Sequence, residues 1–248
     1  MFQLSEHKNT LQINFLNQSP NQSTINTVKD YITDWLHLDA NIQPFYIMSL
    51  TDPILHPLTQ RYLGLRLIAI PDLFEALTWA IIGQQINLTF AYTLKKRFIE
   101  HFGQRYEHQN QTHFIYPEYQ DIHPDSYDAF MKLQFSKQKA TYIIGVAEAM
   151  QQNKLSKKSL AKLSHESAIS LLCQVKGVGN WTAQYVMMKC LRSPNAFPIE
   201  DVGLHNAIKN QLGLPQKPTI HELKQLSQNW EGHQAYATFY LWRSLLSS

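Results

Sequence analysis

The strongest chemical motif in the sequence is a pair of glycines separated by one residue, within LLCQVKGVGNWTAQYV (residues 171–186). The apolar pattern predicts one helix before this turn and a second helix that begins at Asn180. Gly177 and Gly179 permit a positive φ or a close backbone approach in the turn. The turn amides, with the free N–H groups of the second helix, suit an anion such as a phosphate.

Two common phosphate-binding motifs do not fit this turn. A dinucleotide fingerprint needs a preceding strand and a third glycine, whereas a helix precedes this turn and Thr182 stands at the third position. A P-loop would end in Gly-Lys-Ser/Thr, which is absent. The pattern is typical of a helix-hairpin-helix, which holds the phosphate backbone of DNA, and the alternative is an ordinary helix–helix corner with a glycine cap.

A candidate catalytic carboxylate, Asp201, follows the turn at Pro198 and precedes a predicted helix. A carboxylate can stabilise a developing positive charge and can orient or deprotonate water. From the local pattern alone, an aspartate at this place is more typical of a helix N-cap. Glu200 is adjacent but points about 100° away on a helix, so it ranks second.

Aromatic side chains accompany these groups. Trp181 and Tyr185 are four residues apart on the helix that leaves the turn, so both rings can face one cavity. The face of an aromatic ring attracts a cation. A further aromatic residue, Trp242, lies in an apolar stripe from Ala235 to Leu246 that is typical of plain core.

Basic residues are concentrated in one part of the chain. The 248 residues carry a net charge of +3, yet the segment from Lys132 to Arg192 holds ten basic and two acidic residues, a balance of +8. The remainder therefore carries −5. Such a segment indicates a phosphate-binding face, with a solvated lysine-rich surface as the alternative.

Several other classes of protein are excluded. Two cysteines, Cys173 and Cys190, can form neither a disulfide framework nor a four-thiolate cluster. The histidines form no HExxH motif and no pair at i, i+4, so no zinc site follows. With neither a membrane-spanning apolar run nor a signal peptide, we expect a cytoplasmic protein, associated with the nucleoid if the source is bacterial. We also expect a monomer.

The elements that must position these groups are mostly helical. A strand over residues 11–16, a helix over 27–38 and a linker-like stretch with Pro44, Pro53 and Pro57 indicate a small α/β unit. Asp72 then begins a series of helices. Besides a helix from Asp72 they cover about residues 87–101, 136–152, 165–174, 180–191, 202–211 and 232–246, and the polar, aromatic stretch 103–116 is a loop or hairpin.

Three segments resemble the helix-hairpin-helix DNA glycosylases, and most of all their DNA-3-methyladenine glycosylase II (AlkA-type) branch. The resemblance implies a mostly α fold, with a helical body of two lobes over 71–248, a hairpin element at about 165–191, and a shortened small α/β N-terminal domain over 1–70. The segments are LTWAIIGQQINLTFAYTLKKRF (77–98), LLCQVKGVGNWTAQYVMMKCL (171–191) and NAFPIEDVGLHNAI (195–208).

The resemblance also implies roles for these residues. Asp201 is the expected catalytic carboxylate. The expected base pocket consists of Trp181, Tyr185 and Trp242, and the expected contacts to the DNA backbone are Lys176, Gly177, Gly179 and Thr182. Bifunctional relatives place a Schiff-base lysine where this chain has Trp181, so a monofunctional enzyme without lyase activity is expected.

Two further roles rest on the same resemblance. Gln85 aligns with the residue that relatives insert into the base stack to fill the space of the flipped base. The closest members often carry a larger apolar residue there, and a polar helix cap is the alternative. No cofactor is expected except a structural Na⁺ or K⁺ at the hairpin, held by backbone carbonyls of Cys173, Val175 and Val178.

The sequence therefore predicts a DNA N-glycosylase that flips and excises alkylated purines such as 3-methyladenine from double-stranded DNA in base excision repair. Two alternatives remain. One is a glycosylase for an oxidised or deaminated base, and the other is a non-catalytic helix-hairpin-helix DNA-binding module.

Overall fold

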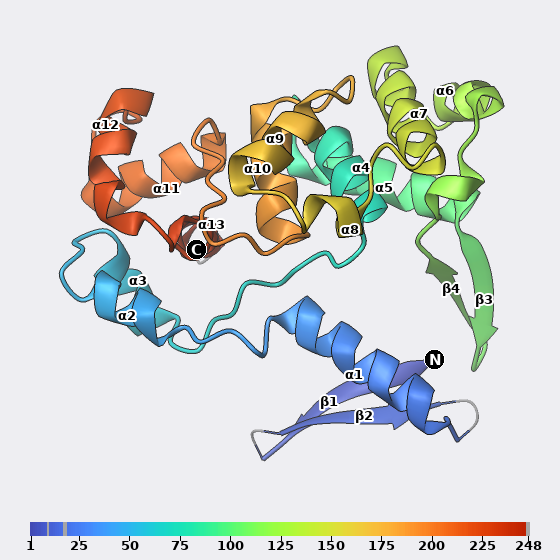
Figure 1. Ribbon diagram of the computed structural model, residues 1–248, viewed down its shortest axis with the longest axis horizontal. Helices are drawn as coiled ribbons and strands as arrows, with labels where there is room; N and C mark the ends of the chain where they lie inside the picture. Colours follow the sequence, from blue (N-terminus) through green and yellow to red (C-terminus); the bar gives the residue numbers. More distant parts are fainter. Residues whose placement is uncertain (9, 17–18, 247–248) are drawn as a thin grey trace.

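The N-terminal part of the chain forms a β-hairpin followed by one helix. The computed structural model describes residues 1–8, 10–16 and 19–246 (Figure 1). Strands β1 (Phe2–His7) and β2 (Thr10–Phe15) pair antiparallel, with Phe2 opposite Phe15. Helix α1 (Gln22–Leu36) begins where the Asn21 side chain accepts a hydrogen bond from the backbone N–H of Thr24. The predicted strand and helix are both present, and the helix begins five residues earlier than expected.

The proline-containing stretch is helical, so the prediction of a linker there was wrong. It forms α2 (Gln43–Ser49) and α3 (Leu55–Arg61). Pro44 and Pro57 lie in the first turns of these helices, where a backbone N–H has no partner within the helix. Phe45 packs on Tyr240 with ring centroids 5.1 Å apart, and α3 packs against the helix that contains this tyrosine. The segment therefore packs on the helical body, whereas residues 1–70 were expected to form one unit.

The remainder of the chain is a helical body in two lobes, as predicted (Figure 1). In the first lobe α4 packs against α5, α7 and α10, and in the second α13 packs against α3 and α11. Most of the predicted helices are confirmed, whereas the short α6, α8 and α12 were not predicted. The helices are α4 (Leu73–Gly83), α5 (Leu88–Phe102), α6 (Tyr127–Lys132), α7 (Lys137–Gln151), α8 (Lys157–Leu160), α9 (His165–Cys173), α10 (Asn180–Lys189), α11 (Val202–Leu212), α12 (Ile220–Leu226) and α13 (Gln234–Ser244).

The stretch 103–116 is a second β-hairpin, made of β3 (Gln104–His108) and β4 (Gln111–Ile115). Its two turn residues, Gln109 and Asn110, have φ values of 49° and 62°. Two consecutive positive φ values match the right-handed twist of a hairpin, and glycine usually supplies the second of them. The Gln-Asn turn therefore lacks the usual sequence signal, which explains why this stretch could not be assigned.

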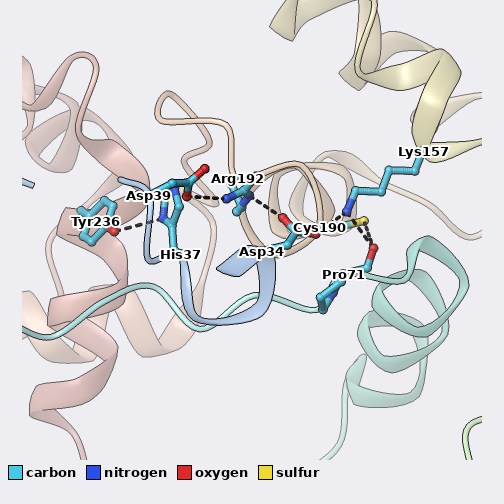
Figure 2. Close-up of polar contacts among 8 residues, drawn as sticks. All are labelled: Asp34, His37, Asp39, Pro71, Lys157, Cys190, Arg192 and Tyr236. Carbon is cyan, nitrogen blue, oxygen red and sulfur yellow. Dashed lines mark hydrogen bonds and ion pairs between the residues drawn. The ribbon is translucent and has the colours of Figure 1, made fainter. Parts of the chain in front are cut away.

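Basic residues of the +8 segment join the N-terminal unit to the helical body (Figure 2). Arg192 contacts Asp34 at 2.9 Å and Asp39 at 3.2 Å. Lys157 contacts the other oxygen of Asp34 at 2.9 Å and donates to the carbonyl of Pro71. Part of the expected phosphate-binding charge is therefore used inside the protein.

Within the described ranges, no helix is long and apolar enough to cross a membrane. The two cysteines are free thiols, with Cys173 exposed and Cys190 buried. The thiol of Cys190 lies 3.7 Å from the carbonyl oxygen of Pro71, beside the ion pairs of Lys157 (Figure 2).

Candidate active site

The glycine-rich turn joins α9 to α10 as a tight hairpin. The N–H of Val178 donates to the carbonyl of Val175 at 3.0 Å, and α10 begins directly after Gly179. Gly177 has a φ of 91°, and a Cβ on it would lie 2.2 Å from the ring of Tyr142. Glycine is therefore required at position 177 both by the backbone angle and by the ring that packs against it.

Gly179 differs from Gly177 in both respects. Its φ is −89°, so of the two expected reasons for glycine, a positive φ applies only to Gly177, and a close approach of phosphate remains the expected reason at Gly179. A Cβ on Gly179 would meet nothing within 4 Å. Gly179 therefore keeps open space at the start of α10, where the first N–H groups of a helix have no partner within the helix.

The two polar side chains expected at the DNA backbone lie in different environments. Lys176 is exposed at the tip of the hairpin. Thr182 is 2 % exposed, and its hydroxyl accepts a hydrogen bond from the side chain of Gln84 at 3.1 Å. The Thr182 side chain therefore faces the interior, and only its backbone N–H, in the first turn of α10, remains for the expected contact to phosphate.

Asp201 is the N-cap of α11 and also the centre of a hydrogen-bonded group of aromatic residues. Its Oδ1 accepts hydrogen bonds from the backbone N–H of Leu204 and from the indole of Trp242, both at 2.7 Å. Its Oδ2 accepts one from the indole of Trp181 at 3.0 Å. The structure thus brings together the two interpretations of this aspartate, as a helix cap and as a site carboxylate. All three donors are N–H groups, so both oxygens of Asp201 act as acceptors here.

The three predicted pocket rings contact one another in a row beside this carboxylate, the first pair stacked and the second tilted. The rings of Trp181 and Tyr185 are nearly parallel, at 23°, with centroids 5.6 Å apart. The rings of Tyr185 and Trp242 are 6.1 Å apart. Trp181 and Tyr185 come from α10 and Trp242 comes from α13, so the row of rings joins the two lobes. Ring faces beside a carboxylate provide a surface that attracts a cationic heterocycle.

Trp79 is a pocket neighbour that sequence reasoning missed. Burial raises the pKa of Tyr185, and a hydrogen bond from the side chain of Trp79 partly offsets this. The phenol is therefore neutral near pH 7. The ring of Trp79 also packs on the ring of Tyr92, with centroids 5.0 Å apart, and lies 5.1 Å from the ammonium of Lys95. The position of Trp79, one turn before Gly83 on α4, was the available sequence signal.

Gln85 and Asp201 line the same hollow, with a volume of about 670 Å³. A second hollow of about 650 Å³ lies beside the hairpin and the first turn of α7. Both hollows include the loop Gln84–Ile86, so this loop lies between them. The expected plug residue, Gln85, is exposed and has a φ of 56°. The first hollow is lined by Gly83, Gln84, Gln85, Ile86, Asn87, Trp181, Glu200, Asp201 and Val202.

Two more residues that the sequence did not indicate hold this loop. The side chain of Gln84 donates to the carbonyl of Gly177 at 3.0 Å as well as to Thr182. The ammonium of Lys139, on α7, donates to the carbonyls of Ile82 and Gln84 at 2.5 and 2.8 Å. Glu200 lines the same hollow as Asp201, and its carboxylate accepts a hydrogen bond from the Asn180 side chain at 3.5 Å.

The expected cation donors, Cys173, Val175 and Val178, all line the hollow beside the hairpin. The carbonyl of Val175 already accepts the N–H of Val178, but a carbonyl oxygen has a second lone pair. Carbonyl oxygens are hard donors, so this set fits an alkali cation. In the part of the chain that the structure describes, no group of three His, Cys, Asp or Glu side chains could hold a metal ion. The cation site stays a prediction.

Comparisons with known sequences agree with this geometry. The profile of the HhH-GPD superfamily of base excision DNA repair proteins matches residues 78–232. The profile of the 8-oxoguanine DNA glycosylase N-terminal domain matches residues 1–77. The chain is 43% identical over 235 residues to a DNA-3-methyladenine glycosylase of Bacillus subtilis (strain 168), which covers 94% of this chain and 78% of the relative.

Solved structures with less than 25% identity show the same fold. A 3-methyladenine DNA-glycosylase from Archaeoglobus fulgidus superposes with a TM-score of 0.82 at 22% identity, covering 97% of this chain and 81% of its own. The Clostridium acetobutylicum 8-oxoguanine glycosylase/lyase, in complex with double-stranded DNA, also gives 0.82, at 16% identity, covering 99% of this chain and 81% of its own. From the length of the profile match and the identity to the relative, the chain belongs to the HhH-GPD superfamily of base excision DNA repair proteins.

Proposed function

We propose that the protein is a monofunctional DNA N-glycosylase that flips alkylated purines, 3-methyladenine among them, out of double-stranded DNA and excises them. The observation that carries this proposal is the carboxylate of Asp201, held by the indoles of Trp181 and Trp242 beside stacked rings. An alkylated purine is cationic, so ring faces retain it. The carboxylate then lies beside the sugar to which that base is attached.

The backbone of the duplex is held by the hairpin in this proposal. Lys176 supplies an exposed cation, and the first amides of α10 supply donors to a phosphate. These contacts fix register without reading sequence. The base must leave the stack because the glycosidic carbon is unreachable inside it, and Gln85 then fills the vacated space.

Cleavage breaks the bond between C1′ of the sugar and a ring nitrogen of the base. The electron pair of this bond leaves with the base, which becomes neutral if it was a cation. The sugar becomes an oxocarbenium ion that the Asp201 carboxylate stabilises. Water then bonds to C1′ and gives up a proton, which Asp201 or the solvent accepts. The products are a free base and an intact abasic site.

The absence of lyase activity follows from position 181. A lyase needs an amine that attacks C1′, and the side chain at this position is an indole bonded to Asp201. Borohydride should therefore trap no covalent adduct between the wild-type protein and DNA. A trapped adduct would mean that another lysine acts as a nucleophile, and mass spectrometry of the adduct would identify it.

The decisive experiment is incubation of the protein with methylated duplex DNA and chromatography of the released bases. Duplexes with 8-oxoguanine or uracil test the second candidate, a glycosylase for another lesion. The 8-oxoguanine duplex is included because residues 1–77 match the N-terminal domain of glycosylases for that base. Release from no substrate, with duplex binding retained, would favour a non-catalytic DNA-binding module.

Two further points belong to the same proposal. We expect the protein to act as a monomer on damaged chromosomal DNA, which light scattering with and without a duplex would test. We also expect Na⁺ or K⁺ at the hairpin carbonyls of Cys173, Val175 and Val178. Replacing K⁺ with a bulky organic cation at constant ionic strength should then weaken duplex binding, and unchanged binding would remove the cation from the proposal.

A further inference from the structure

The backbone of Gln85 needs an external support. A φ of 56° is disfavoured for any residue with a Cβ. The side chain is exposed, so burial of its own atoms does not hold this conformation. The residue follows the last turn of α4, where the terminal carbonyls have no partner within the helix. The contacts of its neighbours must therefore fix where Gln85 points.

Lys139 supplies one of these contacts from another helix. Its side chain is nearly buried, at 8 % exposure of the residue, and the salt bridges among the described residues do not include it. Its ammonium donates instead to the carbonyls of Ile82 and Gln84 at 2.5 and 2.8 Å. A cation suits the C-terminal end of a helix, and here it fixes the peptide directly before Gln85.

Gln84 supplies the second contact and links the loop to the hairpin. Its side chain donates to the carbonyl of Gly177 and to the hydroxyl of Thr182. Gly177 in turn packs under the ring of Tyr142, which is on α7 with Lys139. The loop, the hairpin and α7 therefore form a closed ring of contacts around the hollow beside the hairpin.

We propose that Lys139 is the positioning residue for the plug: with Gln84 it holds Gln85 in its left-handed conformation and at a fixed distance from the hairpin. This inference rests on the proposed role of Gln85 in base flipping. Binding of phosphate by the hairpin and insertion of the plug are then movements of one rigid unit. Lys139 lines the hollow beside the hairpin and not the hollow of Asp201, so its role is not that of a nucleophile.

The test combines Lys139→Met with Gln85→Gly in a double-mutant cycle. Flipping is measured as the fluorescence rise of 2-aminopurine placed beside an alkylated purine, and excision as a single-turnover rate. Lys139→Met should lower both by about 10- to 100-fold, the usual effect of a misplaced site group. Gln85→Gly should do the same. If Lys139 acts through Gln85, the double variant should be no worse than Gln85→Gly alone.

Three controls separate positioning from a general loss of structure. Lys157→Met removes another lysine that donates to a backbone carbonyl, far from the loop, and should leave flipping unchanged. Lys139→Arg keeps a cation with several donors and should restore most of the flipping signal. Should Lys139→Met fail to fold, Thr182→Val breaks the Gln84 link instead and should lower flipping several-fold, again only when Gln85 is present.

Several outcomes would overturn the proposal. If the double variant lost more flipping and excision than Gln85→Gly alone, Lys139 would act through something other than Gln85. An equal loss of affinity for undamaged duplex would mean that Lys139 supports the hairpin and not the plug. A normal signal from Gln85→Gly alone would remove the plug role and the positioning role together, while release of alkylated bases by the wild-type protein would still support the glycosylase activity.

Discussion

The indole nitrogen of Trp242 lies 2.7 Å from Oδ1 of Asp201, so one wall of the base pocket and the candidate catalytic carboxylate are a single hydrogen-bonded unit. The two residues come from α13 and from the N-cap of α11, and these helices pack against each other. Gly203 allows this approach, because a Cβ there would lie 2.9 Å from the Asp201 carboxylate and 3.5 Å from the Trp242 ring. The carboxylate is therefore oriented before any DNA is bound.

Asp201→Asn should abolish base release while leaving duplex binding nearly intact. The amide keeps the shape and can still cap α11, but it carries no charge, and loss of one placed stabilising group costs about 10²–10³ in rate or more. Asp72→Asn is the matched control, since Asp72 caps α4 through the N–H of Glu75 at 2.7 Å and has no place in the pocket. Substantial release by the Asp201→Asn variant would exclude Asp201 as the catalytic group.

Trp242→Phe separates ring stacking from orientation of the carboxylate. The phenyl ring keeps a face for the base but loses the N–H to Asp201. A hydrogen bond to a charged group is worth roughly 1.5–3 kcal/mol, so the single-turnover rate should fall about tenfold or more with little change in affinity for alkylated duplex. Trp35→Phe, on α1, is the control. Weaker binding with an unchanged rate would mean that the indole serves the base alone.

Gly177→Ala and Gly179→Ala should affect different properties. Gly177→Ala should lower the free energy of unfolding, because φ is 91° and the methyl group would overlap the Tyr142 ring. Gly179→Ala meets open space at φ −89°, so it should fold normally. It should nevertheless weaken binding to damaged and undamaged duplex alike, because the methyl group would occupy the approach of a phosphate.

Thermal unfolding of the two glycine variants measures their stability, and duplex titration measures their affinity for DNA. The difference between the two variants, one less stable and the other weaker in DNA binding, tests the assignment better than either result alone. If Gly179→Ala kept its affinity for undamaged DNA but changed which base is released, the hairpin would line the pocket, and its assignment to the backbone would have to be abandoned.

The sequence predicted which side chains lie together at this site better than it predicted the residues that hold them in place. Trp181 and Tyr185 share one face of α10 because they are four residues apart, and Asp201 is the N-cap of α11, as the local pattern indicated. Lys139 and Gln84 were missed because they act across helices more than 50 residues apart in the chain. Such tertiary contacts leave no periodic pattern in a single sequence.

Rules about local sequence also explain the wrong predictions about the fold. The prolines at 44 and 57 were interpreted as breakers, but in a first helical turn proline is tolerated. The density of basic residues along the chain was also an indirect signal of a phosphate-binding face. Arg192 and Lys157 were counted toward a phosphate-binding face, yet both bind Asp34 across the chain (Figure 2). Net charge along a segment does not tell which side chains face the solvent.

Lys176→Ala should change the salt dependence of duplex binding. Loss of one phosphate contact should reduce the slope of log K against log salt by about 0.9, equally for damaged and undamaged DNA. Lys224→Ala removes the same charge from an exposed position on α12, at the far end of the body from α7 (Figure 1), and should leave the slope unchanged. Equal slopes for the two variants would remove Lys176 from the interface.

Lys189 should make a contribution to stability that rises with pH within a defined window. Burial lowers the pKa of this lysine from 10.5 to about 8. Its ammonium donates to the carbonyl of Ile68 and lies 4.9 Å from the centre of the Phe239 ring. Between about pH 8 and 10.5 this lysine is therefore more protonated in the unfolded chain than in the folded one, so its contribution to the free energy of unfolding increases as the pH rises through this window.

Lys189→Met isolates this effect from other titrating groups, because everything else in the two proteins is shared. From pH 8 to 10.5 the wild-type protein should gain on the order of 1–3 kcal/mol of unfolding free energy relative to the Met variant. Urea unfolding of both proteins at several pH values measures the difference. Below about pH 8 the lysine is charged in both the folded and the unfolded state, so the difference should be flat there. Parallel curves across the whole range would mean that Lys189 is as well solvated in the folded protein as in the unfolded chain.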